Sequence, residues 1–381
     1  MEKRFYGNDF KLGILGGGQL GRMFIQEAVN LNLSVHIIDL DPNAPCKEIA
    51  STFTLGDLKS YDDVMAFGKD KDVLTIEIEH VNVDALEELE KQGVKVFPQP
   101  HVLRTIQDKG LQKLFYQKEG IPTPDFYLVE NKAEIDQYLT QMPFMQKMRK
   151  GGYDGKGVTP LKSEADLETA FDAPSVLESF VDLKKELSVI VARNERGEMK
   201  SFPVVELEFN PEANLVEYLF SPASISEDVE TKAREVAELV ANKLDIVGLL
   251  AVELFLTHDD EVLVNEIAPR PHNSGHQSIE GNYTSQFAQH MRSILNMPLG
   301  DTSIIQPSVM VNILGEKDYT GEAIVEGLDE CLSLPGVFIH MYGKKITKPF
   351  RKMGHVTIVN PDLEKAKSIA NQVKDTLKII A

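Results

Sequence analysis

The first hundred residues alternate between short apolar runs and amphipathic stretches, and this order restricts the possible folds more than any other feature. The pattern predicts strands at 11–15, 34–39, 73–78 and 94–97, and helices at 19–30, 61–67 and 84–92. Strands that alternate with helices form parallel sheets covered by helices on both faces. We therefore expect a doubly wound α/β domain over residues 1–100, which ends at the proline-rich segment 97–100.

The order changes after residue 100 and predicts an α+β domain over residues 101–297. Val229, Ala233, Val236, Val240 and Leu244 share one helical face. The apolar runs 249–256 and 262–267 flank a turn-forming His-Asp-Asp segment and predict a β-hairpin. Residues 298–381 are expected to form a small, strand-rich C-terminal domain with a final helix at 362–378.

Composition excludes several classes of function. The chain has 381 residues with 40 Lys or Arg and 59 Asp or Glu, which gives a net charge of −19. A surface this acidic repels nucleic acid and anionic lipid, so neither partner is expected. Two cysteines are too few for a disulfide framework. No apolar run approaches the ~18 residues that span a bilayer, and no signal-peptide pattern is visible, so we expect a cytoplasmic protein.

A glycine-rich turn follows the first predicted strand. Gly16, Gly18 and Gly21 fit the G-x-G-x-x-G spacing, and Asp39 ends the next strand at the distance of a ribose-binding acid. Such a turn lets the amides of a helix N-terminus hold an anion. The spacing alone leaves three interpretations open: a dinucleotide pyrophosphate, another anion, or a tight strand–helix turn without a ligand.

A second glycine-rich segment, residues 147–158, carries three lysines and an arginine within this acidic chain. Exposed amides and cations together are suited to a polyphosphate. We therefore interpret the segment as a phosphate-binding loop and a candidate lid, although it lacks the Walker A pattern.

Two glutamates stand opposite one another in the predicted hairpin. In an antiparallel hairpin the residue numbers of two facing positions always add up to the same value. Pairing Glu253 with Glu266 therefore centres the turn between Asp259 and Asp260. Opposed like charges are destabilising unless a proton or a cation lies between them. Two carboxylates with nucleotide phosphates are a common Mg²⁺ site, so this pair is the predicted metal site.

Two further polar stretches complete the candidate site. Residues 270–276 contain Arg270, His272 and His276 in a turn-rich segment directly after the glutamate pair, which favours a substrate-binding loop. Residues 344–352 form a basic run, which is either a solvated face or, if it folds back over the N-terminal glycine turn, part of the candidate site.

These stretches together resemble the ATP-grasp superfamily and, within it, the N5-carboxyaminoimidazole ribonucleotide synthetases. The resemblance is carried by Gly17-Gly18-Gln19-Leu20-Gly21-Arg22-Met23, by 151–157, by the Asn-Glu-Ile-Ala-Pro-Arg-Pro-His-Asn-Ser-Gly-His segment 265–276, and by 351–355. It implies an ATP-grasp fold with an N-terminal pre-grasp domain and a small C-terminal domain. It also implies a dimer and a carboxylation of 5-aminoimidazole ribonucleotide that consumes ATP and bicarbonate through carboxyphosphate.

The family pattern implies a role for each matching position. ATP would be bound by Lys109, Lys147, Gly152, Tyr153, Asp154, Gly155, Lys156, Gly157, Val158, Glu178, Ser179, Phe180, Val181, Glu186, Asn265 and Glu266. Mg²⁺, or Mn²⁺ in its place, would be held by Glu253 and Glu266.

The reacting groups and the ribonucleotide would meet a second set of positions. Bicarbonate and carboxyphosphate would be handled by Arg270, His272, Lys156, Asp154, Glu77 and Glu79. The ribonucleotide would contact Gln19, Leu20, Tyr153, Arg270, His272, Lys344 and Arg351, with the amides of the glycine turn near its phosphate. Lys156 stands where the family often has Arg, which keeps the charge but loses the bidentate fork.

Other functions remain as alternatives. A formate-dependent glycinamide ribonucleotide transformylase would share the phosphate loops and the glutamate pair. A biotin carboxylase would need a fuller C-terminal domain. An NAD-dependent dehydrogenase would explain the first glycine turn but neither the second glycine segment nor the glutamate pair, and a non-catalytic nucleotide-binding regulator has no need of a complete metal and phosphate set.

Overall fold

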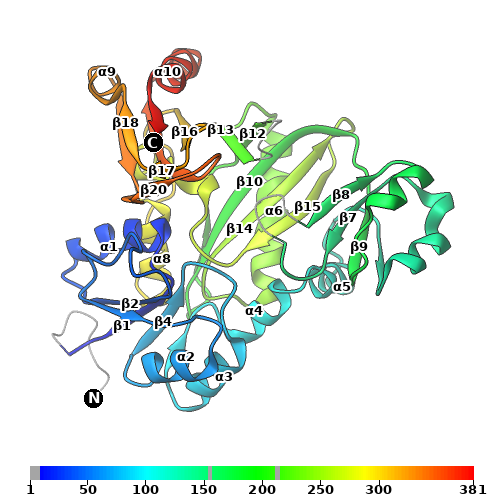
Figure 1. Cartoon of the computed structure of the whole chain (residues 1–381), viewed down its shortest axis with the longest axis horizontal. Coiled ribbons are helices and arrows are strands. Elements are labelled where there is room, and N and C mark those ends of the chain that lie inside the picture. Colours follow the sequence, from blue (N-terminus) through cyan, green and yellow to red (C-terminus); the bar gives the residue numbers. More distant parts are fainter. Residues whose placement is uncertain (1–8, 153–156, 211–214) are drawn as a thin grey trace.

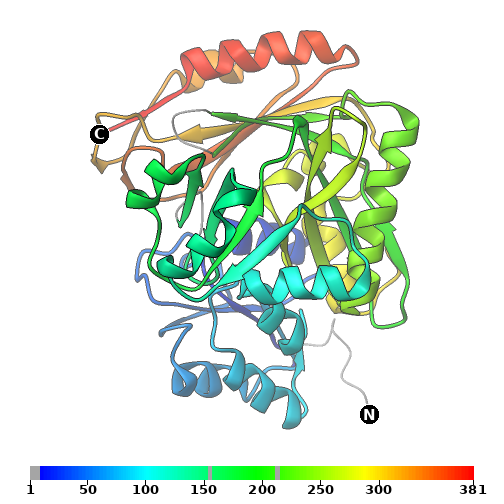
Figure 2. The same ribbon diagram turned by 90° about the vertical axis from the view of Figure 1, so that its right-hand side faces the viewer.

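The computed structural model describes residues 9–152, 157–210 and 215–381. Figure 1 shows an N-terminal α/β unit in blue, a small green lobe at the opposite end, and long central strands between them. The C-terminal strands and helices, in orange and red, lie above the N-terminal unit, as Figure 2 also shows. The order of these units along the chain agrees with the fold that the sequence resemblance implies.

The N-terminal sheet is parallel, with strand order β3-β2-β1-β4-β5. Helix α1 covers one face and helices α2 and α3 cover the other, so the expected doubly wound arrangement is confirmed. The edge strand β3 was not predicted, because three of its four residues are exposed and give no apolar run. The bounds are β1 (Leu12–Leu15), α1 (Gln19–Asn30), β2 (Val35–Asp39), β3 (Thr52–Leu55), α2 (Tyr61–Gly68), β4 (Val73–Ile76), α3 (Val83–Lys91) and β5 (Lys95–Val96).

Two helices then lead into the small lobe, an antiparallel sheet of order β6-β9-β7-β8. Helix α5 begins at an Asp108 cap, whose carboxylate accepts from the Gly110 and Leu111 amides, and ends at Gly120 in the left-handed conformation. The bounds are α4 (Pro100–Ile106), α5 (Lys109–Glu119), β6 (Phe126–Val129), η1 (Lys132–Gln141), β7 (Phe144–Met148), β8 (Val158–Leu161), η2 (Glu164–Thr169) and β9 (Ser175–Ser179).

The largest sheet is antiparallel and has the order β15-β14-β10-β12-β13-β16-β21-β19, with β11 paired to β10. Helix α6 packs its Ala233, Val240 and Leu244 face on one side of β10, β14 and β15. The other side of these strands carries Glu253 and Glu266, which belong to the candidate site. The bounds are β10 (Leu183–Arg193), β11 (Met199–Ser201), β12 (Val205–Asn210), β13 (Leu215–Ser221), α6 (Glu227–Leu244), β14 (Gly248–Thr257), β15 (Val262–Ala268), η3 (Asn273–Gly275), α7 (Ser278–Gly281) and α8 (Gln286–Ile294).

The C-terminal strands continue this large sheet through the pairing of β13 with β16. Helix α10 covers them and closes a separate core that includes Val311, Val356 and Ala370. The bounds are β16 (Ser308–Leu314), β17 (Gly321–Glu322), β18 (Ile324–Glu326), α9 (Leu328–Leu332), β19 (Val337–Met341), β20 (Ile346–Thr347), β21 (Lys352–Val359), α10 (Leu363–Thr376) and β22 (Lys378–Ile380).

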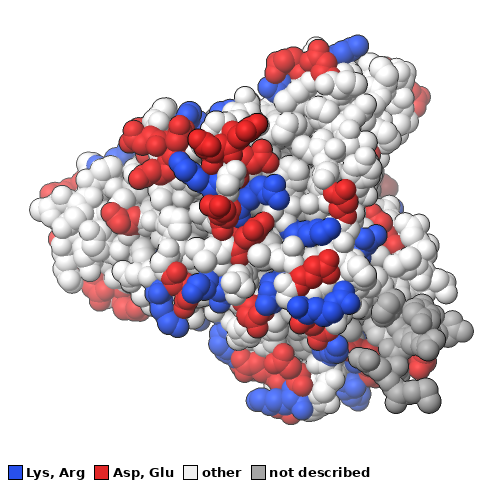
Figure 3. All heavy atoms as spheres, turned by 180° about the vertical axis from the view of Figure 1, so that it is seen from behind, with Lys and Arg blue, Asp and Glu red and all other residues white. Residues whose placement is uncertain are grey.

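Within the described ranges, no helix combines the length and the apolar character needed to cross a bilayer. Figure 3 shows acidic and basic side chains interspersed over one face of the molecule.

Candidate active site

The β14–β15 hairpin places two glutamates opposite one another. Glu253 pairs with Glu266 in the register that the sequence predicts. The register then shifts by one residue, so Leu254 faces Val264 and Asn265 is left as a bulge. Because of this bulge, Val264 and Ile267 both pack in the core while Asn265 and Glu266 both point to the opposite side.

Like charge, together with the burial of Glu253, makes this carboxylate pair suited to a cation. Withdrawal from water, followed by the nearby charges of Glu266 and Glu186, raises the pKa of Glu253 to about 7. Partial withdrawal from water opposes ionisation of Glu266, whose side chain is still 52% exposed, but Lys109 outweighs it and the pKa of Glu266 lies below its usual range. Two oxygen ligands on facing strands, one of them short of compensating positive charge, fit a divalent ion that completes its shell with phosphate and water.

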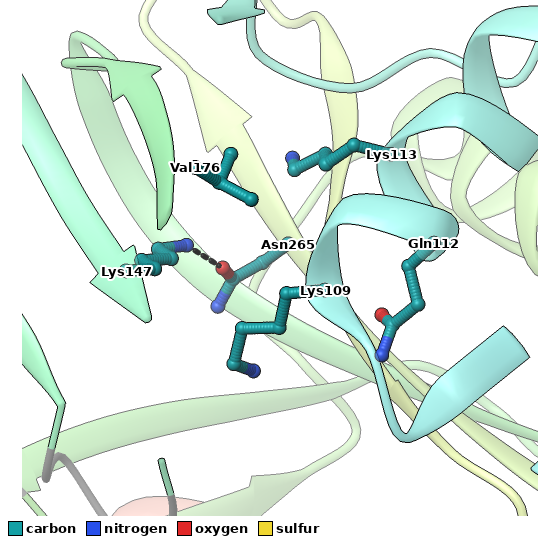
Figure 4. A pocket seen from close by; sticks show the side chains of 6 residues that line it. All are labelled: Lys109, Gln112, Lys113, Lys147, Val176 and Asn265. Carbon is teal, nitrogen blue, oxygen red and sulfur yellow. Dashed lines mark hydrogen bonds between the residues drawn. The ribbon is translucent and has the colours of Figure 1, made fainter. Parts of the chain in front are cut away.

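Three lysines line a pocket beside this hairpin, as Figure 4 shows. The Lys109 ammonium lies 2.6 Å from Glu266 Oε1. Lys147 Nζ donates to Glu178 Oε1 at 2.6 Å and to Asn265 Oδ1 at 3.0 Å. The third lysine, Lys113, also pairs with Glu178. These side chains come from α5 and β7, and with Gln112, Val176 and Asn265 they line a pocket between the small lobe and the large sheet.

Arg149 belongs to the basic segment but has a structural partner. Its guanidinium forms a bidentate pair with Asp108, with Nε to Oδ1 at 2.9 Å and Nη2 to Oδ2 at 3.0 Å. Its carbonyl also accepts from the Lys109 amide at 2.9 Å. Arg149 therefore fixes the start of α5 against β7, which sets the distance between Lys109 and Lys147.

The N-terminal glycine turn is filled by the protein's own Glu77. This carboxylate accepts from the Gly18 amide at 2.8 Å and from the Gly21 amide at 3.1 Å. A Cβ on Gly18 would lie 2.5 Å from Glu77 Oε1, so the close approach requires glycine. Asp39 accepts from the Gly17 amide at 2.6 Å. The Gly18 and Gly21 amides, which would hold the pyrophosphate in a dinucleotide site, are thus bonded to Glu77. The Asp39 carboxylate, which would bind the ribose, accepts from the turn instead. Both contacts contradict the NAD interpretation.

Arg270 and His272 lie directly after β15, beside the glutamate pair. The Arg270 guanidinium is held 2.7 Å from Glu79 Oε1, so Glu79 orients Arg270 while Glu77 holds the glycine turn. His272 Nε2 lies 3.8 Å from Glu253 Oε1. Burial, together with the charge of Arg270, holds the pKa of His272 well below its usual range, so this imidazole is neutral.

The basic run of the C-terminal domain does fold back onto the N-terminal domain. Lys345 Nζ donates to Asn43 Oδ1 at 3.3 Å, and a Cβ on Gly343 would lie 3.8 Å from Arg22 Nη1. Within the run, Lys344 Nζ donates to the Lys352 carbonyl at 2.6 Å, and Arg351 Nη1 to the Ile346 carbonyl at 2.5 Å. The run therefore faces the same side of the molecule as the glycine turn.

The remaining predicted residues divide into placed and undescribed positions. Burial raises the pKa of Glu186 on β10, and this carboxyl adds to the negative charge at Glu253. Gln19 and Leu20 form the first turn of α1, and Phe180 follows β9 with its side chain exposed. Gly152 and Gly157 flank the segment that lies outside the described residues, namely Tyr153, Asp154, Gly155 and Lys156.

Sequence reasoning missed Lys113, Asp108 and the side-chain role of Glu178. Lys113 follows Lys109 by four residues on α5, and this spacing, visible in the sequence, places both side chains on one face of a helix. The ion pairs of Glu178 and Asp108 join distant segments and leave no local pattern.

Comparison with known proteins identifies the family. Residues 10–107 match the ribonucleotide synthetase preATP-grasp domain, 114–287 the ATP-grasp domain, and 308–369 the phosphoribosylaminoimidazole carboxylase C-terminal domain. The N5-carboxyaminoimidazole ribonucleotide synthase of Bacillus subtilis is 36% identical over 95% of this chain and 94% of its own length. By contrast, the chain spans only 65% and 63% of the phosphoribosylaminoimidazole carboxylases of Vigna aconitifolia and Candida glabrata, at 39% identity.

Solved structures agree with this assignment. The N5-carboxyaminoimidazole ribonucleotide synthetase of Thermotoga maritima superimposes with a TM-score of 0.89 at 43% identity, covering 98% of this chain and 99% of that one. The Aspergillus clavatus enzyme, solved with ADP and 5-aminoimidazole ribonucleotide, gives a TM-score of 0.88 at 36% identity, covering 97% and 99%. The chain therefore belongs to the N5-carboxyaminoimidazole ribonucleotide synthetase family, whose members are ATP-dependent ligases of the ATP-grasp fold.

Proposed function

We propose that this chain carboxylates 5-aminoimidazole ribonucleotide with bicarbonate in de novo purine biosynthesis, forming N5-carboxyaminoimidazole ribonucleotide, ADP and phosphate. The observation that carries this proposal is the opposed pair Glu253 and Glu266, with lysines on one side and the Arg270–His272 segment on the other. This order of groups suits a reaction that moves the γ-phosphoryl group of ATP toward Arg270. The Aspergillus clavatus relative, solved with ADP and the ribonucleotide, supports the same substrate class.

Mg²⁺ is the metal that the carboxylate pair fits, and Mn²⁺ would fit the same oxygen ligands. Glu253 and Glu266 would hold it, and it would supply charge neutralisation at the β- and γ-phosphates. Lys109, which pairs with Glu266 in the structure, would then exchange this carboxylate for a phosphate oxygen. Lys147 lies close enough to Asn265 to act on the same phosphates.

The rest of ATP would follow the small lobe. Glu178, Ser179, Phe180 and Val181 lie at the end of β9 and beyond, and in this proposal backbone groups of this segment would read the adenine edge. Glu186 would accept hydrogen bonds from the ribose hydroxyls. These donors would compensate its carboxylate for the water that burial removes. The glycine segment, from Gly152 through Tyr153, Asp154, Gly155, Lys156 and Gly157 to Val158, would cover the phosphates and exclude water.

Arg270 and His272 would act on the carboxyl transfer. A bicarbonate oxygen attacks the γ-phosphorus, the bond to ADP breaks, and carboxyphosphate forms. Arg270, oriented by Glu79, would stabilise its negative charge. Carboxyphosphate then releases phosphate as its carboxyl carbon bonds to the exocyclic amine, and the departing phosphate would take the proton that the amine loses. His272, whose lowered pKa makes it a weak base, would position carboxyphosphate as a neutral hydrogen-bonding group.

The ribonucleotide would lie between the glycine turn and the C-terminal domain. Gln19 and Leu20 at the start of α1 would contact it, and Lys344 and Arg351 would bind its phosphate, because these segments converge on one side. Glu77 would shape this pocket by fixing the turn. We also propose a homodimer and a cytoplasmic location, the latter consistent with two buried free thiols, Cys46 and Cys331.

ADP release in matched reactions tests the proposal. Bicarbonate with 5-aminoimidazole ribonucleotide should give rapid ADP release that requires both compounds and Mg²⁺. Formate with glycinamide ribonucleotide should give none. Release with the second pair and not the first would assign the chain to the transformylase reaction instead.

A further inference from the structure

Lys113 is the most buried of the three lysines around the nucleotide pocket. Helix α5 places it one turn after Lys109, so both ammonium groups lie on the pocket side of the helix (Figure 4). Its side chain is 5% exposed, whereas that of Lys109 is 18% exposed. A charge this enclosed needs a specific counter-ion.

Glu178 is that counter-ion, and it is shared. One carboxylate oxygen pairs with Lys113, and the other accepts from Lys147 at 2.6 Å. The Glu178 side chain is 3% exposed. Burial disfavours its charge, but Lys147 and Lys113 outweigh burial and hold the pKa of Glu178 below its usual range.

A second contact fixes where the Lys113 ammonium lies. Lys113 Nζ donates to Thr123 Oγ1 at 2.5 Å, and Thr123 Oγ1 donates to the Val264 carbonyl at 2.8 Å. The Val264 amide donates to the Pro122 carbonyl at 2.8 Å. Lys113 is thereby anchored to the strand residue that directly precedes the Asn265 bulge.

The charge balance of these three groups decides what Lys147 can do. With Lys113 present, one carboxylate serves two ammonium groups, and the cluster keeps a net positive charge for an anion. Without Lys113, Glu178 and Lys147 would form a closed, neutral pair in a buried site, where opposite charges attract strongly. A phosphate would then have to compete with Glu178 for the same ammonium.

We propose that Lys113 is a positioning residue of the nucleotide site, which occupies Glu178 so that Lys147 stays available to the ATP phosphates. The inference deepens the proposed function and rests on its nucleotide site, and it does not depend on which carboxyl acceptor is used. Lys113 itself touches no phosphate in this account. Its effect passes through Glu178 alone.

The test is the affinity for Mg-ADP, measured by calorimetry, in three variants. Lys113→Met should weaken binding by about tenfold or more, because Lys147 is neutralised. The double variant Lys113→Met/Glu178→Gln should bind Mg-ADP more tightly than Lys113→Met, since it no longer contains the closed pair. Lys118→Met, at an 80% exposed lysine of the same helix, is the matched control.

Steady-state kinetics provide a second readout. In Lys113→Met the KM for ATP should rise while kcat changes little, and a merely structural role would lower the amount of folded protein instead. In the double variant Lys147 loses its carboxylate partner and keeps the contact with Asn265, so its ammonium stays available to a phosphate. The proposal is overturned if Lys113→Met binds Mg-ADP normally, or if the double variant binds as poorly as Lys113→Met. Mg-ADP binding needs neither bicarbonate nor ribonucleotide, so a failure of the proposed reaction would be seen separately.

Discussion

Replacement of Glu253 by Gln should stabilise the metal-free protein at high pH. The folded-state pKa of Glu253 is raised from 4.5 to about 7, first by burial and then by Glu266 and Glu186. The stability that depends on its proton is therefore complete below pH 4.5 and is lost as the pH rises through about 7. At about 1.4 kcal/mol per pKa unit, the loss amounts to roughly 3 kcal/mol at pH 8.

Differential scanning calorimetry in EDTA measures this effect. Glu253→Gln should unfold roughly 3–6 °C above the unaltered protein at pH 8, with little difference at pH 5, where Glu253 is protonated. Saturating Mg²⁺ should reverse the order at pH 8, because only the unaltered protein has both carboxylates for the ion. Glu261→Gln, at an exposed glutamate of the same hairpin, removes equal charge and serves as the control. A lower or unchanged Tm for Glu253→Gln at pH 8 in EDTA would refute the reasoning.

Three further substitutions test other parts of the site. Glu266→Gln should lower ATP turnover by about a hundredfold or more while far-UV circular dichroism stays unchanged, because the metal site loses a charge; normal turnover would remove the metal assignment. Arg270→Ala should leave Mg-ADP affinity intact in calorimetry and eliminate bicarbonate-dependent ADP release, whereas a loss confined to ATP affinity would show that Arg270 has another role. Gly18→Ala should displace Glu77 and lower stability by about 1–3 kcal/mol in urea unfolding. The Gly18→Ala/Glu77→Ala double variant should be no less stable than the worse single variant, and full additivity would contradict that coupling.

Periodicity and register made much of the fold predictable. Helix α1 has the predicted bounds, Gln19–Asn30, because a glycine turn and a strand fix its start. The Glu253–Glu266 pairing followed from the constant sum of facing positions. The bulge at Asn265 did not, because a single extra residue in a strand leaves the apolar pattern almost unchanged. The domain boundaries at 100 and 297 stay predictions.

The parts of the site that escaped prediction depend on contacts between distant segments. Glu77 was expected among the reacting groups, and only the structure shows it bound to the Gly18 and Gly21 amides. Arg149 was expected in the phosphate loop, and its partner Asp108 lies 41 residues away. Ion pairs of this kind leave no periodic signal in the sequence, because each partner, taken alone, looks like an ordinary charged surface residue.

Anomalous diffraction from a crystal grown with Mn²⁺ and ADP tests the central claim most directly. We expect a manganese peak at about 2.2 Å from carboxylate oxygens of both Glu253 and Glu266, with the remaining ligands from the nucleotide phosphates and water. A nucleotide in the pocket with its metal bound elsewhere, and these two side chains turned away from it, would contradict the account.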